Sequence, residues 1–130
     1  MSNLLNALAT SSSGLAAQAG RLNVVAQNVA NVDTPGYRRK LTSFETMLPG
    51  LDGQTGVRLG PERLDGSDLP MIHDPSHPLA NSEGLYAGSN VSLTIEMADA
   101  REAQRSYEAN LQSFDNARQM SRSLLELLRR

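Results

Sequence analysis

The sequence predicts a mainly α-helical protein with a small β insert. Two terminal stretches, 1–36 and 91–130, carry apolar residues at the three- and four-residue spacing of an amphipathic helix. The stretch between them, 37–90, holds most of the glycines and all but one of the prolines, so no long helix fits there. We therefore divide the chain into an N-terminal helix with its turn, a β-rich or irregular linker and a C-terminal helix. The two helices are expected to form one structural unit.

The N-terminal helix carries a heptad pattern. One heptad position is occupied by Leu8, Leu15, Leu22 and Val29, and the other by Leu5, Ser12, Ala19 and Ala26. The second position holds mostly small residues, which favours close approach of another helix. Gly14 and Gly20 each weaken the helix by about 1 kcal/mol relative to alanine. We expect this helix to need a packing partner.

The N-terminal helix is predicted to end by about Asp33, within the stretch LNVVAQNVANVDTPGYRRK (22–40). Pro35 disfavours the helical conformation at Thr34, and Pro35-Gly36 suits the central positions of a type II turn. The run Arg38-Arg39-Lys40 that follows is expected to be a solvated flank of the turn.

Asn28 and Asn31 lie one helical turn apart, although asparagine is a poor helix former. They indicate a helix face that makes specific contacts. The alternative is that they cap a fraying helix end.

The linker is expected to contain short β segments at 37–47, 56–64 and 69–73. Asp65-Gly66 is a hairpin-turn signal, so the last two segments are predicted to pair through it. Pro61 and Pro70 restrict these segments to edge strands or irregular chain.

The C-terminal helix is predicted from about Val91 to the end of the sequence. Its apolar stripe consists of Met97, Ala100, Tyr107, Leu111, Phe114, Leu125 and Leu128, widened by Ala103, Ala117 and Leu124. Gln104, Arg118 and Ser121 interrupt the stripe, so the helix is not a strong autonomous coiled coil.

Composition and charge exclude several classes of function. The net charge of −2 gives no electrostatic footprint for nucleic acid or an anionic membrane. The sequence has no cysteine, which excludes disulfides and thiolate chemistry. The N-terminal residues offer neither a cationic region nor a long apolar stretch, so we expect no cleaved signal peptide and no membrane insertion.

Candidate catalytic and metal-binding residues are few. His73, Asp74 and His77 could be imagined as metal ligands, but Pro75 and Pro78 oppose the helix that would bring two histidines together at this spacing. A structured turn is the preferred interpretation. Nucleotide-binding loops and nucleophile motifs are missing from the sequence. We expect no enzyme activity, no cofactor and no small-molecule substrate.

Three stretches resemble one protein family. The stretch 22–40 resembles the N-terminal signature of the bacterial flagellar axial proteins, which include rod and hook subunits. The stretch NVSLTIEMADAREAQRSYEANLQSFDNARQM (90–120) is similar to their closing helix, with matches that include Glu96, Met97, Tyr107, Asn110 and Leu111. The stretch HDPSHPLANSEGLY (73–86) resembles the linker of proximal-rod subunits of the FlgC type. DTPGY (33–37) is shared with the FlgB-type rod subunit, which stays an alternative.

The resemblance implies a structural subunit of the bacterial flagellar basal body. Such subunits are exported unfolded by the flagellar type III apparatus and assemble, with copies of themselves and other rod subunits, into the periplasmic rod that transmits motor torque. Their terminal helices pack as an antiparallel coiled-coil pair near the filament axis. A soluble helical-hairpin adaptor or secretion chaperone is the alternative from another class, although such an adaptor favours a long, charged, uninterrupted seam.

The resemblance and the heptads together indicate a set of subunit-packing residues. We expect Asn28 and Asn31 to hydrogen-bond within the packed layer and fix its register, unless they only cap the helix end. The full set is Leu22, Asn28, Asn31, Thr34, Pro35, Gly36, Tyr37, Glu96, Met97, Tyr107, Asn110, Leu111 and Phe114.

Overall fold

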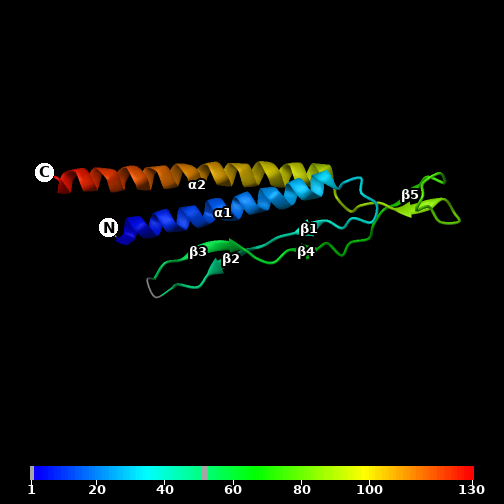
Figure 1. The fold of residues 1–130 in the computed structure, drawn as a ribbon, viewed down its shortest axis with the longest axis horizontal. Helices are drawn as coiled ribbons and strands as arrows, with labels where there is room; N and C mark the ends of the chain where they lie inside the picture. The colour runs from blue at the N-terminus through cyan, green and yellow to red at the C-terminus, as the bar shows by residue number, and fades with distance from the viewer. Residues whose placement is uncertain (1, 51–52) are drawn as a thin grey trace.

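The computed structural model describes residues 2–50 and 53–130 and has the predicted fold class, two long helices with a small β insert. Figure 1 shows the helices side by side with opposed chain directions and with both chain ends at one end of the molecule. The longer helix has 36 residues, which corresponds to about 54 Å. In chain order the elements are α1 (Ser2–Ala30), β1 (Lys40–Leu41), β2 (Phe44–Met47), β3 (Gly56–Leu59), β4 (Arg63–Leu64), β5 (Met71–His73), β6 (Leu85–Ala87) and α2 (Leu93–Leu128).

Small side chains form the seam between the helices. Ala103 and Ala117 are buried on α2, and Ala17 is buried on α1 beside Val24 and Val25. A Cβ atom at Gly14 would lie 3.0 Å from the side-chain nitrogen of Asn110, so a larger residue would crowd Asn110 where α2 crosses this point. Close backbone approach therefore decides which faces meet.

The seam is offset from the predicted heptad stripes. On α1 the whole set Leu5, Ser12, Ala19 and Ala26 is exposed. On α2, Met97 and Leu111 are exposed, whereas Tyr107 and Phe114 are half-buried. The alanine and glycine faces pack together because they allow the helices to approach most closely. The larger apolar residues are left beside the seam.

A long irregular hairpin runs along α1 (Figure 1). Its outer part pairs β2 with β3, from Phe44↔Leu59 to Met47↔Gly56, and its inner part pairs β1 with β4, at Lys40↔Leu64 and Leu41↔Arg63. Between these parts, residues 42–43 lie opposite 60–62, so one strand carries an extra residue where Pro61 would interrupt pairing. A Cβ atom at Gly20 would meet a terminal methyl group of Leu59, so the Leu59 side chain would have to shift if Gly20 were replaced.

The predicted hairpin through Asp65-Gly66 is wrong. The backbone N–H of Asp65 donates to the carbonyl of Arg39 at 2.8 Å, which continues the β1–β4 pairing. The Asp65 carboxylate then accepts the N–H of Ser67 at 2.9 Å and turns the chain away. Strand β5 pairs instead with β6, an antiparallel partner that the sequence did not suggest.

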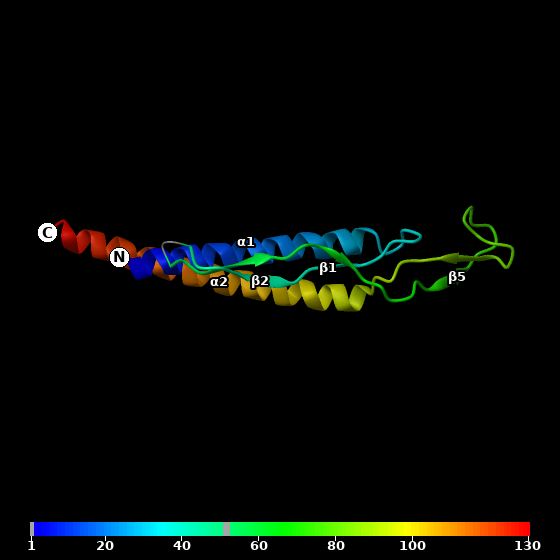
Figure 2. The same ribbon diagram turned by 90° about the horizontal axis from the view of Figure 1, so that it is seen from below.

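The β5–β6 hairpin projects from the end of the molecule opposite the chain ends, as Figures 1 and 2 both show. Gly84, with φ of 77°, precedes β6 and adopts a conformation that favours glycine. Within residues 2–50 and 53–130, none of the helices combines the length and the apolar character needed to cross a membrane.

Candidate functional site

The turn after α1 lies between the helix pair and the β5–β6 hairpin. Gly36 has φ of 75°, and the N–H of Tyr37 donates to the carbonyl of Thr34 at 3.1 Å, as expected for the predicted type II turn at Pro35-Gly36. The N–H of Gly36 also donates to the carbonyl of Ala87 in β6 at 3.1 Å. This turn therefore connects the end of α1 to the projecting hairpin.

Asn28 joins α1 to the start of the long hairpin and to α2. Its side chain is 1% exposed. The amide nitrogen donates to the carbonyl of Lys40 at 3.0 Å and to Glu96 Oε2 at 3.3 Å. The amide oxygen accepts the N–H of Lys40 and the hydroxyl of Tyr37, both at 2.9 Å. These four contacts use the full hydrogen-bonding capacity of an asparagine side chain.

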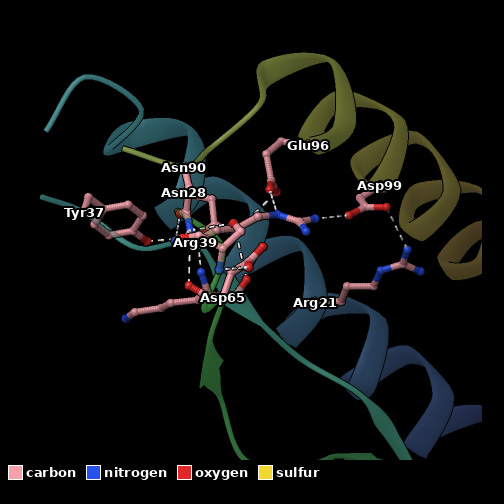
Figure 3. A network of polar contacts seen from close by, with 10 residues as sticks. Arg21, Asn28, Tyr37, Arg39, Asp65, Asn90, Glu96 and Asp99 are labelled. Carbon is pink, nitrogen blue, oxygen red and sulfur yellow. Dashed lines mark hydrogen bonds and ion pairs between the residues drawn. The ribbon is translucent and has the colours of Figure 1, made fainter. Parts of the chain in front are cut away.

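Glu96 and Arg39 form a buried ion pair beside Asn28 (Figure 3). Glu96 is 0% exposed, and its Oε1 pairs with Nε of Arg39. The guanidinium of Arg39 continues to Asp99 at 2.9 Å, and Arg21 reaches Asp99 and Glu102 at 3.5 Å. A buried carboxylate is tolerated only when it is paired and hydrogen-bonded, and Arg39 and Asn28 meet both requirements.

Asn90 fastens the base of the long hairpin just before α2. Its side-chain oxygen accepts the N–H of Arg39 at 2.6 Å, and its amide nitrogen donates to the carbonyls of Asp65 at 3.1 Å and Ser67 at 3.3 Å. We call the set Asn28, Tyr37, Arg39, Asn90, Glu96 and Asp99 the polar clamp. It connects α1, both strands at the hairpin base and α2 (Figure 3).

Sequence reasoning named three residues of the polar clamp but missed Arg39, Asn90 and Asp99. Arg39 was expected to be a solvated flank of the turn, but it pairs with a buried carboxylate. The expectation failed because its partners Glu96 and Asp99 are distant in sequence and come close only when α2 folds back along α1. The available signal was the basic run directly after a helix-ending turn. Asn90 offered no comparable sequence signal.

Comparisons with known proteins bear on this arrangement. A family model described as flagella basal body rod protein matches residues 8–38, and one described as flagellar basal body rod FlgEFG protein C-terminal matches 83–127. The flagellar basal-body rod protein FlgC of Agrobacterium fabrum is 40% identical, covering 90% of this chain and 89% of that protein. The FlgC proteins of Bacillus subtilis and Salmonella typhimurium are each 32% identical, covering 94% and 95% of this chain and 96% and 97% of their own lengths.

This chain belongs to the flagellar basal-body rod protein family. It is a structural rod subunit of the FlgC type, located in the flagellar basal body, where it assembles with other rod components. The FlgB-type and adaptor alternatives are not favoured. Both matched regions contribute to the polar clamp of the rod subunit, since Asn28 lies in the first and Glu96 in the second.

In the rod subunit, Asn28 and Asn31 make different kinds of contact. The side chain of Asn31 hydrogen-bonds to residues that are close in sequence. Its amide nitrogen donates to the carbonyl of Gln27 at 2.8 Å, and its oxygen accepts the hydroxyl of Thr34 at 3.1 Å. It therefore closes the end of α1. Asn28 instead contacts segments that are distant in sequence.

The other predicted packing residues of the rod subunit are divided between the seam and the surface. Asn110 packs against Gly14, and Leu22, Tyr107 and Phe114 are half-buried. Met97 and Leu111 are exposed. The structure thus brings only part of the predicted set together within one chain.

The histidines form no metal site in the part of the chain that the structure describes. His77 stacks on Tyr86 with ring centroids 3.9 Å apart, and its Nδ1 accepts the N–H of Leu79 at 3.1 Å. Among residues 2–50 and 53–130, no group of three or more histidines and carboxylates could hold a metal ion.

Burial raises the pKa of the Tyr37 hydroxyl above its ordinary value of 10.0, and Glu96 and Glu62 raise it further, whereas Lys40 opposes the shift. The neutral phenol is therefore favoured in the folded protein. It can donate its hydrogen bond to Asn28 at neutral pH.

Proposed function

We propose that the rod subunit assembles through the apolar surface that its helices leave outside the intramolecular seam. The observation that carries this proposal is the exposure of large apolar residues along both helices, such as Leu5 on α1 and Met97 and Leu111 on α2. Large apolar patches on an exposed face mark protein contact sites. In the rod these residues contact neighbouring subunits, and the stack of subunits transmits motor torque.

The core of this proposed contact consists of Leu22, Met97, Leu111 and the half-buried aromatic residues Tyr107 and Phe114. The polar clamp has a separate role: it fixes how the hairpin sits on the helix pair, so that each copy presents the same surface. The residues of the helix-ending turn, Thr34 to Tyr37, hold that arrangement. The three segments 1–36, 37–90 and 91–130 act as one unit in this role.

The remaining parts of the proposal concern export and chemistry. The chain is passed unfolded through the flagellar type III apparatus and becomes part of the periplasmic rod. A thin intramolecular core supports this proposal, because a chain that buries few large apolar side chains is easily unfolded. The subunit acts without catalysis, cofactor, nucleic acid or small-molecule substrate.

The test is a substitution on the exposed face of α2. Leu111 is 41% exposed, so Leu111→Asp leaves the isolated chain folded but places a carboxylate in the proposed contact, where its burial is unfavourable. We expect export to continue and incorporation into rods to fall at least tenfold, measured by immunoblotting of isolated basal bodies. Gln112→Asp, at an exposed polar neighbour, is the matched control.

Leu22→Asp provides a second variant on α1, although this residue is half-buried and its substitution also weakens the monomer. Normal motility and normal rod content for both Leu111→Asp and Leu22→Asp would contradict the proposed contact surface.

A further inference from the structure

The loop at the end of the projecting hairpin is held by side chains that accept backbone N–H groups. It spans residues 74–84, between β5 and β6, and we call it the tip loop. Near its start, the carboxylate of Asp74 accepts the N–H of Ser76 at 3.2 Å. Near its end, the amide oxygen of Asn81 accepts the N–H of Leu85 at 3.0 Å. Each of these contacts fixes one turn of the loop.

His77 holds the turn between these two contacts. Its Nδ1 accepts the N–H of Leu79 at 3.1 Å, and its carbonyl accepts the N–H of Ala80 at 3.0 Å. Pro78 is the second residue of this turn, a position that proline favours. Aspartate, asparagine or serine commonly occupies the first position, where the side chain accepts the N–H two residues further on. In this chain an imidazole takes their place.

Among the three acceptors, only the imidazole changes its charge near neutral pH. The amide of Asn81 does not titrate, and the hydroxyl of Ser76 lowers the pKa of Asp74, so this carboxylate stays charged. Histidine ordinarily changes its charge between about pH 5 and pH 8. To accept from Leu79, His77 must be neutral with its proton on Nε2. Once Nδ1 is protonated, two N–H groups face each other and the hydrogen bond is lost.

The surroundings of the ring decide which contact gives way. His77 stacks on Tyr86 of β6, with ring centroids 3.9 Å apart and an angle of 9° between the planes. An aromatic face attracts a cation, and the carboxylate of Asp74 attracts it as well, so both contacts tolerate the charged ring. The other titratable groups of this hairpin are Glu83 in the tip loop and His73 at the end of β5. The contact that fails on protonation is therefore the hydrogen bond that closes the turn.

We propose that His77 is a pH-dependent latch of the tip loop, which holds the turn at Pro78 when it is neutral and releases the turn when it is protonated. The latched loop binds one proton fewer than the released loop. The latch is therefore complete above the range in which histidine titrates, and it is lost as pH falls through that range. Release frees Leu79, which is 66% exposed, so the projecting end of the subunit changes shape. The polar clamp contains no histidine and keeps the helices joined.

Nuclear magnetic resonance of the full chain, labelled with nitrogen-15, tests the latch directly. At about pH 8 we expect a scalar coupling across the hydrogen bond between the amide nitrogen of Leu79 and Nδ1 of His77. At about pH 5 this coupling should vanish, and the amides of Leu79 and Ala80 should lose their protection from hydrogen exchange, corrected for the intrinsic rate. Both changes should follow the charge of the His77 ring. The amides of α1 and α2 should keep their protection.

Two variants separate the latch from other effects of pH. His77→Asn places an amide oxygen before Pro78, where asparagine suits the turn but does not titrate. Its protection at Ala80 should change by less than about twofold between the two pH values, because the acceptor is kept. His73→Gln removes the other of the two histidines in the sequence and should leave the response to pH intact.

Four results would overturn the latch. Two concern the natural chain: a missing coupling at the higher pH, or unchanged protection of Leu79 and Ala80 at the lower pH. The third is a response that disappears in His73→Gln, because the proton would then bind elsewhere. The fourth is a response that persists in His77→Asn, which no longer carries the titrating acceptor.

Discussion

At one end of the helix pair, Asn28, Arg39 and Glu96 join the helices through buried polar contacts, whereas at the other end Leu4 and Leu127 share an open apolar groove. Within the polar clamp, partners in the same chain use the full hydrogen-bonding capacity of Asn28. At the other end, where both chain ends lie, Leu127 and Leu128 are exposed. One end is therefore held together by contacts within the chain, and we propose that the other end is covered by neighbouring molecules.

The difference between the ends has a physical origin. Hydrogen bonds and ion pairs are directional, so a buried polar network allows only one arrangement of the elements that it joins. Apolar contact is non-directional and accepts any partner of suitable shape. A subunit that must hold one shape and then bind its neighbours benefits from a buried polar network and from an exposed apolar surface. The following predictions run from the largest expected effect on the free energy of unfolding to the smallest.

Arg39→Met should have the largest effect. It leaves the carboxylate of Glu96 buried without its cation, which destabilises a protein by about 3–5 kcal/mol. The double variant Arg39→Met/Glu96→Leu should regain most of this loss, because both charges are removed together. Urea unfolding followed by circular dichroism measures the effect, with Arg105→Met at an exposed position of α2 as the control. Equal stability of Arg39→Met and the control would show that the clamp contributes nothing.

Asn28→Ala should reduce the free energy of unfolding by about 1–3 kcal/mol, because Glu96, Lys40 and Tyr37 each lose a hydrogen-bonding partner. Asn31→Gly at the helix end should reduce it by only about 0.5 kcal/mol, because glycine is well tolerated where a helix ends. The same urea titration compares the two variants. We also expect Asn28→Ala to be exported but to form fewer rods than Thr34→Ser, and equal rod yield would argue against a role for Asn28 in fixing register.

Tyr37→Phe should reduce stability by about 0.5–1.5 kcal/mol, the usual value of one hydrogen bond. The raised pKa adds a pH signature. Because the folded protein holds the phenol proton more tightly than the unfolded chain, this contribution is complete below pH 10.0 and is lost as pH rises through the folded pKa. Stability measured from pH 8 upward should therefore fall more steeply above pH 10 for the natural protein than for Tyr37→Phe. Parallel curves would contradict the buried position of the hydroxyl.

Leu127→Ser should change the stability of the isolated chain by less than about 0.5 kcal/mol, since the side chain is largely exposed. The same variant should reduce incorporation into rods, because the leucine is proposed to be covered by a neighbouring molecule. Thermal unfolding and rod content are measured side by side. A large loss of stability, or unchanged rod content, would remove the contrast between the two ends.

The sequence by itself determined the two long helices and the turn that follows the first of them. The helical spacing of apolar residues predicted two long helices, which the structure has. Pro35-Gly36 predicted the turn after α1, where Gly36 has a positive φ. These features are local: a proline restricts the residue before it, and helical spacing is repeated every few residues. The resemblance to flagellar axial proteins depended on the same local stretches.

Only the tertiary structure decided which surfaces and side chains meet. The choice of the Ala103 and Ala117 face over Met97 and Leu111 depends on how closely two backbones approach, which periodicity does not encode. The pairing of β4 with β1, rather than with β5, depends on contacts between distant residues. The contacts of Asn28 and Arg39 with Glu96 likewise depend on the tertiary structure. The sequence shows how many hydrogen bonds a polar side chain can make, but it does not show which residue will be the partner.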